Sequence, residues 1–170
     1  QDTNWKAQAD TAVTWGAKES RSEVQLLTDR ILIRVEKANG AVQFLSRNGK
    51  KLLTENPSEP RLLLDSQTWN FFAWDKNERL KSKGVLADDF MDLSTKARYI
   101  SFGQKKLRMP LVLSNKGYAI GVAAGSTVLF CNVRTYGQYI YTQGTGQIDY
   151  YFIYDKNQER NIEQYRNLPV

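Results

Sequence analysis

Histidine is absent from this 170-residue chain, and cysteine occurs once, as Cys131. Without histidine the chain cannot carry a Ser-His-Asp or Cys-His triad, an imidazole zinc site or imidazole acid–base catalysis. A single cysteine excludes an internal disulfide and a four-thiolate metal site. We therefore expect no metal and no cofactor, and most kinds of catalytic site are excluded before any motif is considered.

Long apolar runs are also missing, because no segment approaches the roughly 18 residues that a membrane span requires. With 41% hydrophobic and 25% charged residues, the composition is that of one folded domain with a buried core. The chain begins at Gln1 and not at methionine, which indicates a processed or trimmed form. One cysteine fits export as well as the cytosol, with a slight preference for export.

The net charge of +6 is not concentrated, because the two halves of the chain carry equal net charge. Short basic runs such as Lys50-Lys51 and Lys105-Lys106 stand beside turn residues, where lysines usually face solvent. An even charge distribution without a basic arm argues against a nucleic-acid partner, and we expect none.

Short apolar and β-branched segments separated by turn residues recur along the chain. Asn39-Gly40 and Asn48-Gly49 are the pairs favoured in tight hairpin turns, and they flank the apolar segment Ala41–Leu45. Asn115-Lys116-Gly117 separates the apolar segments 110–113 and 118–122, which predicts a hairpin with Pro110 at the start or edge of its strand. Further strands are predicted at 127–133 and 147–154.

Helical signal is confined to the C-terminal end, where Asp155 or Asn157 could cap a helix that continues to Asn167. Ile162 and Tyr165 lie three residues apart, on one face of that helix. Many short strands and one terminal helix predict an all-β fold, an antiparallel β-sandwich with a short C-terminal helix. We expect a single domain over residues 1–170, with 1–22 as an extended N-terminal segment and the helix within 156–168.

Carboxylates are densest at Asp88, Asp89 and Asp92, which surround Phe90. A pair of carboxylates is the usual equipment for glycoside hydrolysis. Adjacent side chains of an extended segment point to opposite faces, however, so Asp88 and Asp89 cannot easily act on one substrate. A solvated loop is favoured over a ligand contact, and catalysis by this group alone is not expected.

Aromatic residues form two groups in the sequence: Trp69, Phe71, Phe72 and Trp74, and then Tyr136, Tyr139, Tyr141, Tyr150, Tyr151 and Tyr154. A flat ring with a polar tip can stack on the apolar face of a sugar, and it can equally fill the core of a sandwich. For any single ring, core packing or an interface is favoured.

Four stretches in order carry a resemblance to a known family. The first is Glu23–Val35, which ends in Arg34-Val35, and the second is Arg98–Gly103 followed by 107–120, with Pro110, Leu113-Ser114 and Gly117-Tyr118. The third is Gly146–Tyr154, in which Asp149 precedes paired aromatic residues, and the fourth is Gln164–Leu168. Together they resemble the N-terminal β-sandwich of glycoside hydrolase family 31, the α-glucosidase and α-xylosidase family. The chain departs from that pattern in having no Tyr-Gly-Leu-Gly-Glu motif before Pro110, and in having Ala119 where the family has a second glycine.

The resemblance implies a galactose-mutarotase-like sandwich without catalytic residues of its own, because the family's catalytic aspartates lie on a (β/α)8 barrel. The implied partners are that barrel, in the same full-length protein, and carbohydrate. Asp88, Asp89 and Phe90 would belong to a loop at the sugar pocket, and Trp74, Tyr136 and Tyr139 would stack on sugar or face the barrel. The exposed interface would make the chain weakly self-associating.

A free-standing, lectin-like carbohydrate-binding module with an aromatic platform is the alternative. It would show a concave site with ordered rings, whereas an accessory domain would show a large apolar patch. A mutarotase-type epimerase is disfavoured, since that chemistry resembles work done by a histidine together with a carboxylate.

Overall fold

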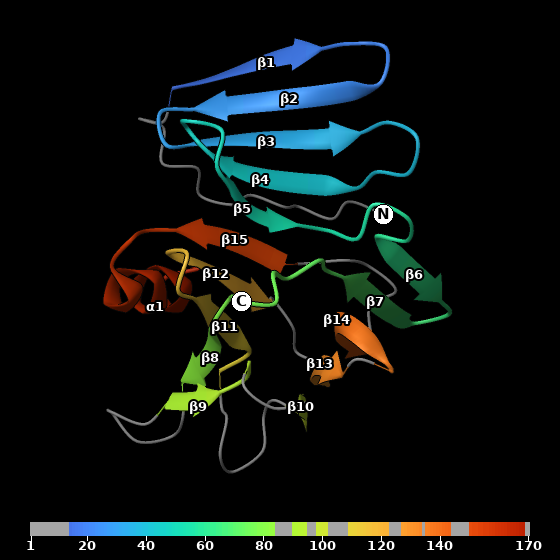
Figure 1. The fold of residues 1–170 in the computed structure, drawn as a ribbon, viewed down its shortest axis with the longest axis vertical. Helices are drawn as coiled ribbons and strands as arrows, with labels where there is room; N and C mark the ends of the chain where they lie inside the picture. Colours follow the sequence, from blue (N-terminus) through green and yellow to red (C-terminus); the bar gives the residue numbers. More distant parts are fainter. Residues whose placement is uncertain are drawn as a thin grey trace.

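The computed structural model describes residues 14–83, 90–94, 98–101, 109–122, 127–133, 135–143 and 150–168. These residues form three antiparallel five-stranded sheets and one helix (Figure 1). The predicted all-β antiparallel sandwich with a short C-terminal helix is therefore confirmed.

The first sheet is a meander in chain order. Its strands are β1 (Trp15–Glu19), β2 (Glu23–Thr28), β3 (Ile31–Glu36), β4 (Val42–Ser46) and β5 (Lys51–Thr54). Gly40 and Gly49 adopt φ values of +72° and +81°, which L-residues with a Cβ rarely adopt. Both predicted Asn-Gly turns are thus confirmed, and they fix the connections on either side of β4.

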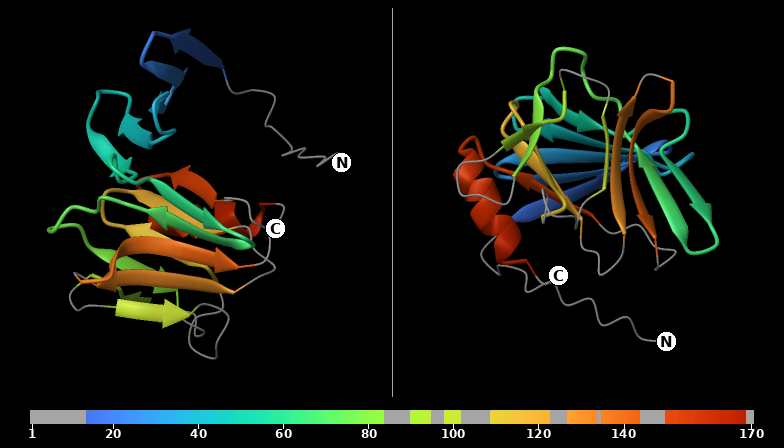
Figure 2. Two further views of the ribbon diagram at one scale, coloured as in Figure 1. Left: turned by 90° about the vertical axis from the view of Figure 1, so that its right-hand side faces the viewer. Right: turned by 90° about the horizontal axis from the view of Figure 1, so that it is seen from below.

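The other two sheets stack face to face, as the two perpendicular views in Figure 2 show. One has the order β10-β13-β14-β7-β6 and the other β15-β12-β11-β8-β9. The strands of the former are β6 (Arg61–Leu64), β7 (Gln67–Phe71), β10 (Arg98–Ser101), β13 (Val128–Val133) and β14 (Gly137–Gln143). Those of the latter are β8 (Leu80–Lys83), β9 (Phe90–Asp92), β11 (Leu111–Ser114), β12 (Tyr118–Val122) and β15 (Tyr150–Tyr154).

One hydrophobic core joins all three sheets. Phe130 and Ile140 enter it from the sheet that contains β13 and β14, and Tyr118 and Ile120 enter it from β12. Phe44 of β4 connects the first sheet to this core, since its ring stacks on Phe152 of β15 with the ring centroids 4.0 Å apart. The meander is therefore packed against the sandwich through its β4–β5 edge, while β1 at the opposite edge is exposed throughout.

The predicted hairpin at Pro110 is confirmed: β11 pairs with β12, with Leu111 opposite Gly121. Pro110 precedes β11, and its carbonyl oxygen accepts a hydrogen bond from the N–H of Val122 at 3.0 Å. The predicted helix is confirmed as α1 (Gln158–Arg166), whose cap Asn157 accepts the N–H of Glu159 at 3.0 Å. In the described part of the chain, no helix has the length and apolar character to cross a membrane.

Candidate functional site

An outward-facing aromatic surface covers the centre of the β10-β13-β14-β7-β6 sheet. Side chains alternate along a strand, so the buried residues Thr68 and Asn70 of β7 face inward and Trp69 and Phe71 face outward. Tyr141 lies opposite Trp69, with the ring centroids 4.9 Å apart, and Tyr139 lies opposite Phe71 at 5.5 Å. Two cross-strand aromatic pairs therefore lie side by side on the half-buried outer face of β7 and β14.

Apolar side chains extend this surface onto both neighbouring strands. Leu62 of β6 is opposite Trp69, and Leu129 of β13 is opposite Tyr141. Leu62 and Leu64 are 42% and 56% exposed. We call this surface the aromatic face; it consists of Leu62, Leu64, Trp69, Phe71, Leu129, Tyr139 and Tyr141.

The one helix in the described part of the chain covers a different sheet. The side chains of Ile162 and Tyr165 pack on Leu111, Leu113 and Ala119, which occupy the outer face of β11 and β12. The two outer faces of the sandwich therefore differ: α1 closes one, whereas the aromatic face of the other presents large apolar groups at the surface. A patch of this kind on a monomer marks an interaction site.

The three candidate rings lie in three different environments. Trp74 is 6% exposed and packs between Phe72 and Phe130, at centroid distances of 5.1 and 5.3 Å, so its ring belongs to the core. Tyr136 is 71% exposed in the turn between β13 and β14. Tyr139 belongs to the aromatic face. The structure does not bring the three rings together into one platform.

Asp88 and Asp89 lie outside the described residues, but Phe90 is described as the first residue of β9. The ammonium groups of Lys81 and Lys83 lie over its ring, 3.9 and 4.4 Å from the centroid. Such cation–π contacts hold the ring at the edge of the sheet. Phe90 and Lys81 also line a cavity of about 540 Å³, together with Arg79, Asp92, Ser94, Asn115 and Gln158.

Sequence reasoning missed a buried carboxylate, Glu55, which joins all three sheets. Its side chain accepts hydrogen bonds from the N–H of Val42 at 2.8 Å, from Arg61 Nη2 at 2.5 Å and from the Tyr150 hydroxyl at 2.8 Å. Burial, and then the charge of Glu55, raises the pKa of Tyr150 well above its ordinary value. With every side of the carboxylate occupied, Glu55 is suited to hold the sheets together.

A second buried carboxylate, Glu78, ties the β8 end of its sheet to the β11–β12 hairpin. It accepts hydrogen bonds from Ser114 Oγ at 2.5 Å and from the Tyr118 hydroxyl, and it pairs with Lys116 Nζ at 2.7 Å. Burial, followed by the Glu78 charge, raises the pKa of Tyr118 far above its usual range. No sequence pattern marked Glu55 or Glu78, because decisive partners such as Tyr150 for Glu55 and Tyr118 for Glu78 are distant in the chain.

The described residues offer little for catalysis. Glu55 and Glu78 are buried and occupied, and neither joins a second carboxylate. Asp92 accepts two hydrogen bonds from Ser94, from its N–H at 2.8 Å and its hydroxyl at 2.7 Å. Nowhere among the described residues do three His, Cys, Asp or Glu side chains gather in a group that could hold a metal ion. The aromatic face, and the β9 edge that carries Phe90 (the Phe90 edge), offer groups suited to contact.

Comparison with known proteins supports the fold. No protein-family model matches the sequence, and neither does any curated protein. The structure is similar to part of a GH31 dextranase from Flavobacterium johnsoniae complexed with isomaltotriose, with a TM-score of 0.73 and 18% identity, over 91% of this chain and 20% of the dextranase chain. The chain thus spans about a fifth of the length of that enzyme.

Two further enzymes show the same likeness. A GH31 α-xylosidase from a soil metagenome, complexed with xylose, is similar with a TM-score of 0.70 and 19% identity, over 99% of this chain and 29% of the other. A cycloalternan-forming enzyme from Listeria monocytogenes is similar with a TM-score of 0.72 and 16% identity, over 90% of this chain and 16% of the other. The resemblance to a domain of GH31 enzymes is confirmed at the level of the fold.

Proposed function

We propose that this chain is the non-catalytic N-terminal domain of a retaining α-glycosidase of the glycoside hydrolase 31 type. It packs on the catalytic barrel of the full-length protein and lends a loop to the sugar pocket. The fold likeness supports this, since nearly all of this chain matches a minor part of three GH31 or related enzymes. The observation that carries the proposal is the aromatic face.

The composition of the aromatic face suits a permanent interface. Interface cores are enriched in Tyr, Trp and Phe, and four of its seven members are aromatic. Covering a patch of roughly 400 Å² contributes on the order of 10 kcal/mol, from which the entropy lost on association is subtracted. Within one polypeptide that entropy is small, because the two domains are already tethered.

The Phe90 edge is the proposed position of the loop that reaches the sugar. Residues 84–89, which include Asp88 and Asp89, lie between β8 and β9 in the sequence, and Lys81 and Lys83 hold Phe90 at the start of β9. The cation–π contacts fix the ring of Phe90 beside β8, where the loop joins β9. The cavity beside Phe90 supplies space of the size that small ligands occupy, roughly 300–1,000 Å³.

A lectin-like module is the second candidate, and the paired rings of the aromatic face favour it. Trp69 with Tyr141 and Phe71 with Tyr139 form flat apolar surfaces on which a sugar ring could stack. In this case the protein would bind neutral sugar without any other domain.

Sedimentation and sugar titration of the same protein distinguish the two candidates. The accessory domain is expected to form weak, concentration-dependent dimers through the aromatic face and to bind neither isomaltotriose nor xylose. Leu62→Ser/Leu64→Ser should weaken the dimer. Leu63→Ser is the matched control, since Leu63 is 53% exposed on the opposite face of the same strand. A strict monomer that binds sugar, and loses it in Tyr139→Ala, would favour the lectin.

A further inference from the structure

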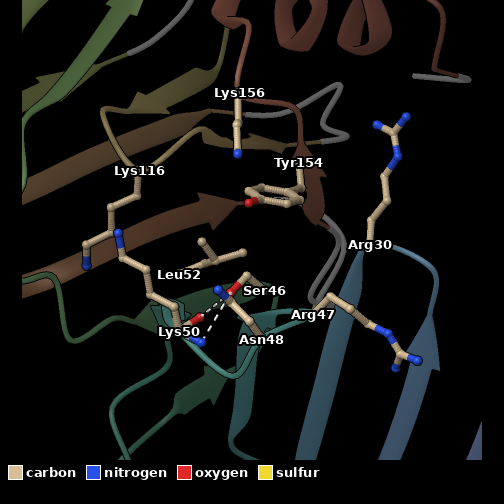
Figure 3. Close-up of a pocket in the computed structure, with 9 residues that line it drawn as sticks. All are labelled: Arg30, Ser46, Arg47, Asn48, Lys50, Leu52, Lys116, Tyr154 and Lys156. Carbon is tan, nitrogen blue, oxygen red and sulfur yellow. Dashed lines mark hydrogen bonds between the residues drawn. The ribbon is translucent and has the colours of Figure 1, made fainter.

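A cavity of about 520 Å³ lies where the first sheet meets β15 (Figure 3). The β4–β5 turn contributes Arg47, Asn48 and Lys50 to its wall. The β11–β12 turn contributes Lys116, and the end of β15 contributes Tyr154 and Lys156. With Arg30 from the β2–β3 turn, three turns and the end of β15 thus meet around one cavity.

Among the described residues that line this cavity, five carry a cationic side chain and none is Asp or Glu. Two of the five have carboxylate partners: Lys116 pairs with Glu78 at 2.7 Å, and Arg30 lies 3.7 Å from Asp155. Arg47, Lys50 and Lys156 have no salt bridge to any described residue. An uncompensated positive charge therefore faces a concave space that is large enough for a small ligand.

Backbone contacts fix the turns that carry these cations, although the side chains themselves reach toward solvent. Gly117 has φ +88° and approaches the backbone of Lys156 so closely that a Cβ would lie 3.2 Å from the Lys156 Cα, which sets Lys116 beside Lys156. Lys50 is fixed through its N–H, which donates to Ser46 Oγ at 3.1 Å. The N–H of Arg47 donates to the Arg30 carbonyl at 3.0 Å.

The side chains divide around the ring of Tyr154, as Figure 3 shows. Lys50, Lys116 and Lys156 lie on the side of the ring that carries the hydroxyl, and Arg30 and Arg47 lie on the other side. Asn48 is fixed at the floor, since its Oδ1 accepts a hydrogen bond from Ser46 Oγ at 2.5 Å. The amide N–H groups of Asn48 add further donors to the lining of the cavity.

We propose that this cavity binds a tetrahedral oxyanion, a phosphate or a sulfate, either free or carried on a sugar. Three lysines are rotatable point donors, which suit the oxygens of a tetrahedral anion, whereas planar carboxylates are matched by the fork of arginine. The bound anion would accept hydrogen bonds from Lys50 and Lys156 and relieve their mutual repulsion, and Lys116, which is paired with Glu78, would supply a third donor. This site is independent of the aromatic face.

Calorimetric titration of the whole chain tests the proposal with four ligands: inorganic phosphate, glucose 6-phosphate, glucuronate and glucose. Both phosphates should bind at low salt, and glucose should not. Tighter binding of glucose 6-phosphate than of phosphate would assign the natural ligand to sugar esters, and equal binding would assign it to the free anion. In Lys50→Gln/Lys156→Gln the affinity should fall by about tenfold or more, since hydrogen bonds to charged groups are lost.

The matched control is Lys18→Gln/Lys76→Gln, which removes the same charge at exposed positions away from the cavity. Its affinity should change by less than about twofold. Thermal unfolding gives a second reading, since phosphate should raise the Tm of the native chain more than that of the cavity variant. Equal losses in both variants, glucuronate binding as tightly as phosphate, or no phosphate binding by the folded native chain would each overturn the proposal.

Discussion

The ring of Tyr165 lies so close to Gly121 that a Cβ on Gly121 would come within 2.2 Å of Tyr165 Cδ2. The Tyr165 hydroxyl donates a hydrogen bond to the Val122 carbonyl at 2.9 Å. The ring is therefore held both by its contact with Gly121 and by this hydrogen bond. Glycine at position 121 thereby lets α1 sit directly on β12. Through this contact α1 covers the outer face of the sheet that contains β11 and β12. The aromatic face lies on the other sheet of the sandwich.

Gly121→Ala is expected to destabilise the protein by about 1–3 kcal/mol, the usual cost of overpacking a well-packed contact. The ring cannot move away without losing its hydrogen bond to Val122. Urea unfolding followed by circular dichroism measures the change. Gly16→Ala is the control, because nothing lies within 4 Å of a Cβ there. Equal stability of the two variants would contradict this account of α1 docking.

Glu55→Gln should cost about 3–5 kcal/mol of folding stability, because it leaves Arg61 without its buried counter-charge. The guanidinium of Arg61 also donates from Nη1 to the Gly40 carbonyl at 2.7 Å, so it cannot turn to solvent without breaking that contact. Glu59→Gln, at an exposed position, should change the free energy of unfolding by less than about 0.5 kcal/mol. A similar small effect at both positions would show that Glu55 does not join the sheets.

Stability should decline at alkaline pH as the buried tyrosines ionise in the unfolded chain. Burial raises the pKa of Tyr165 to about 12, and the pKa values of Tyr118 and Tyr150 are also raised. A raised folded-state pKa favours the neutral form, so its stabilising effect is full below about pH 10, the unfolded value, and is lost as the pH rises above it. For Tyr165 the loss approaches its limit near pH 12.

Denaturant midpoints measured from neutral pH to about pH 12 test this, with tyrosinate absorbance as the second reading. Each of the three tyrosines adds up to about 1.4 kcal/mol per pH unit within its window. Tyr165→Phe should flatten part of the decline, whereas Tyr136→Phe should not, since Tyr136 is 71% exposed. A flat profile up to pH 12 would contradict the burial of these hydroxyl groups.

The hairpins and the helix were predictable because their signals are local. Asn39-Gly40, Asn115-Lys116-Gly117 and the Asn157 cap each specify a turn or a helix start within a few residues, and each lies where expected. The strand β1 lay within the segment expected to be extended, residues 1–22, but its pairing with β2 had no sequence signal of comparable strength. Periodicity alone assigns a short strand, not its partner.

The long-range contacts were not predictable, because they depend on how the sheets assemble. Glu55 and Tyr150 are 95 residues apart, and nothing local distinguishes Glu55 from a surface glutamate. Lys50 was expected to face solvent in a turn, and its side chain is exposed there. The fold, however, brings Lys116 and Lys156 to the same cavity. Trp74 and Tyr139 belong to neighbouring aromatic groups in the sequence, yet one lies in the core and the other on the aromatic face.

The isolated chain should have no glycosidase activity. Retaining hydrolysis needs two carboxylates about 5–5.5 Å apart on either side of one glycosidic bond. Of the described residues, one carboxylate, Asp92, lines the cavity beside Phe90, and none lines the cationic cavity. The purified protein should therefore release no chromophore from an aryl α-glucoside or an aryl α-xyloside. Turnover that disappears in Asp88→Asn or Asp89→Asn would show that the loop between β8 and β9 carries chemistry of its own, and would overturn the assignment of this chain as a non-catalytic domain.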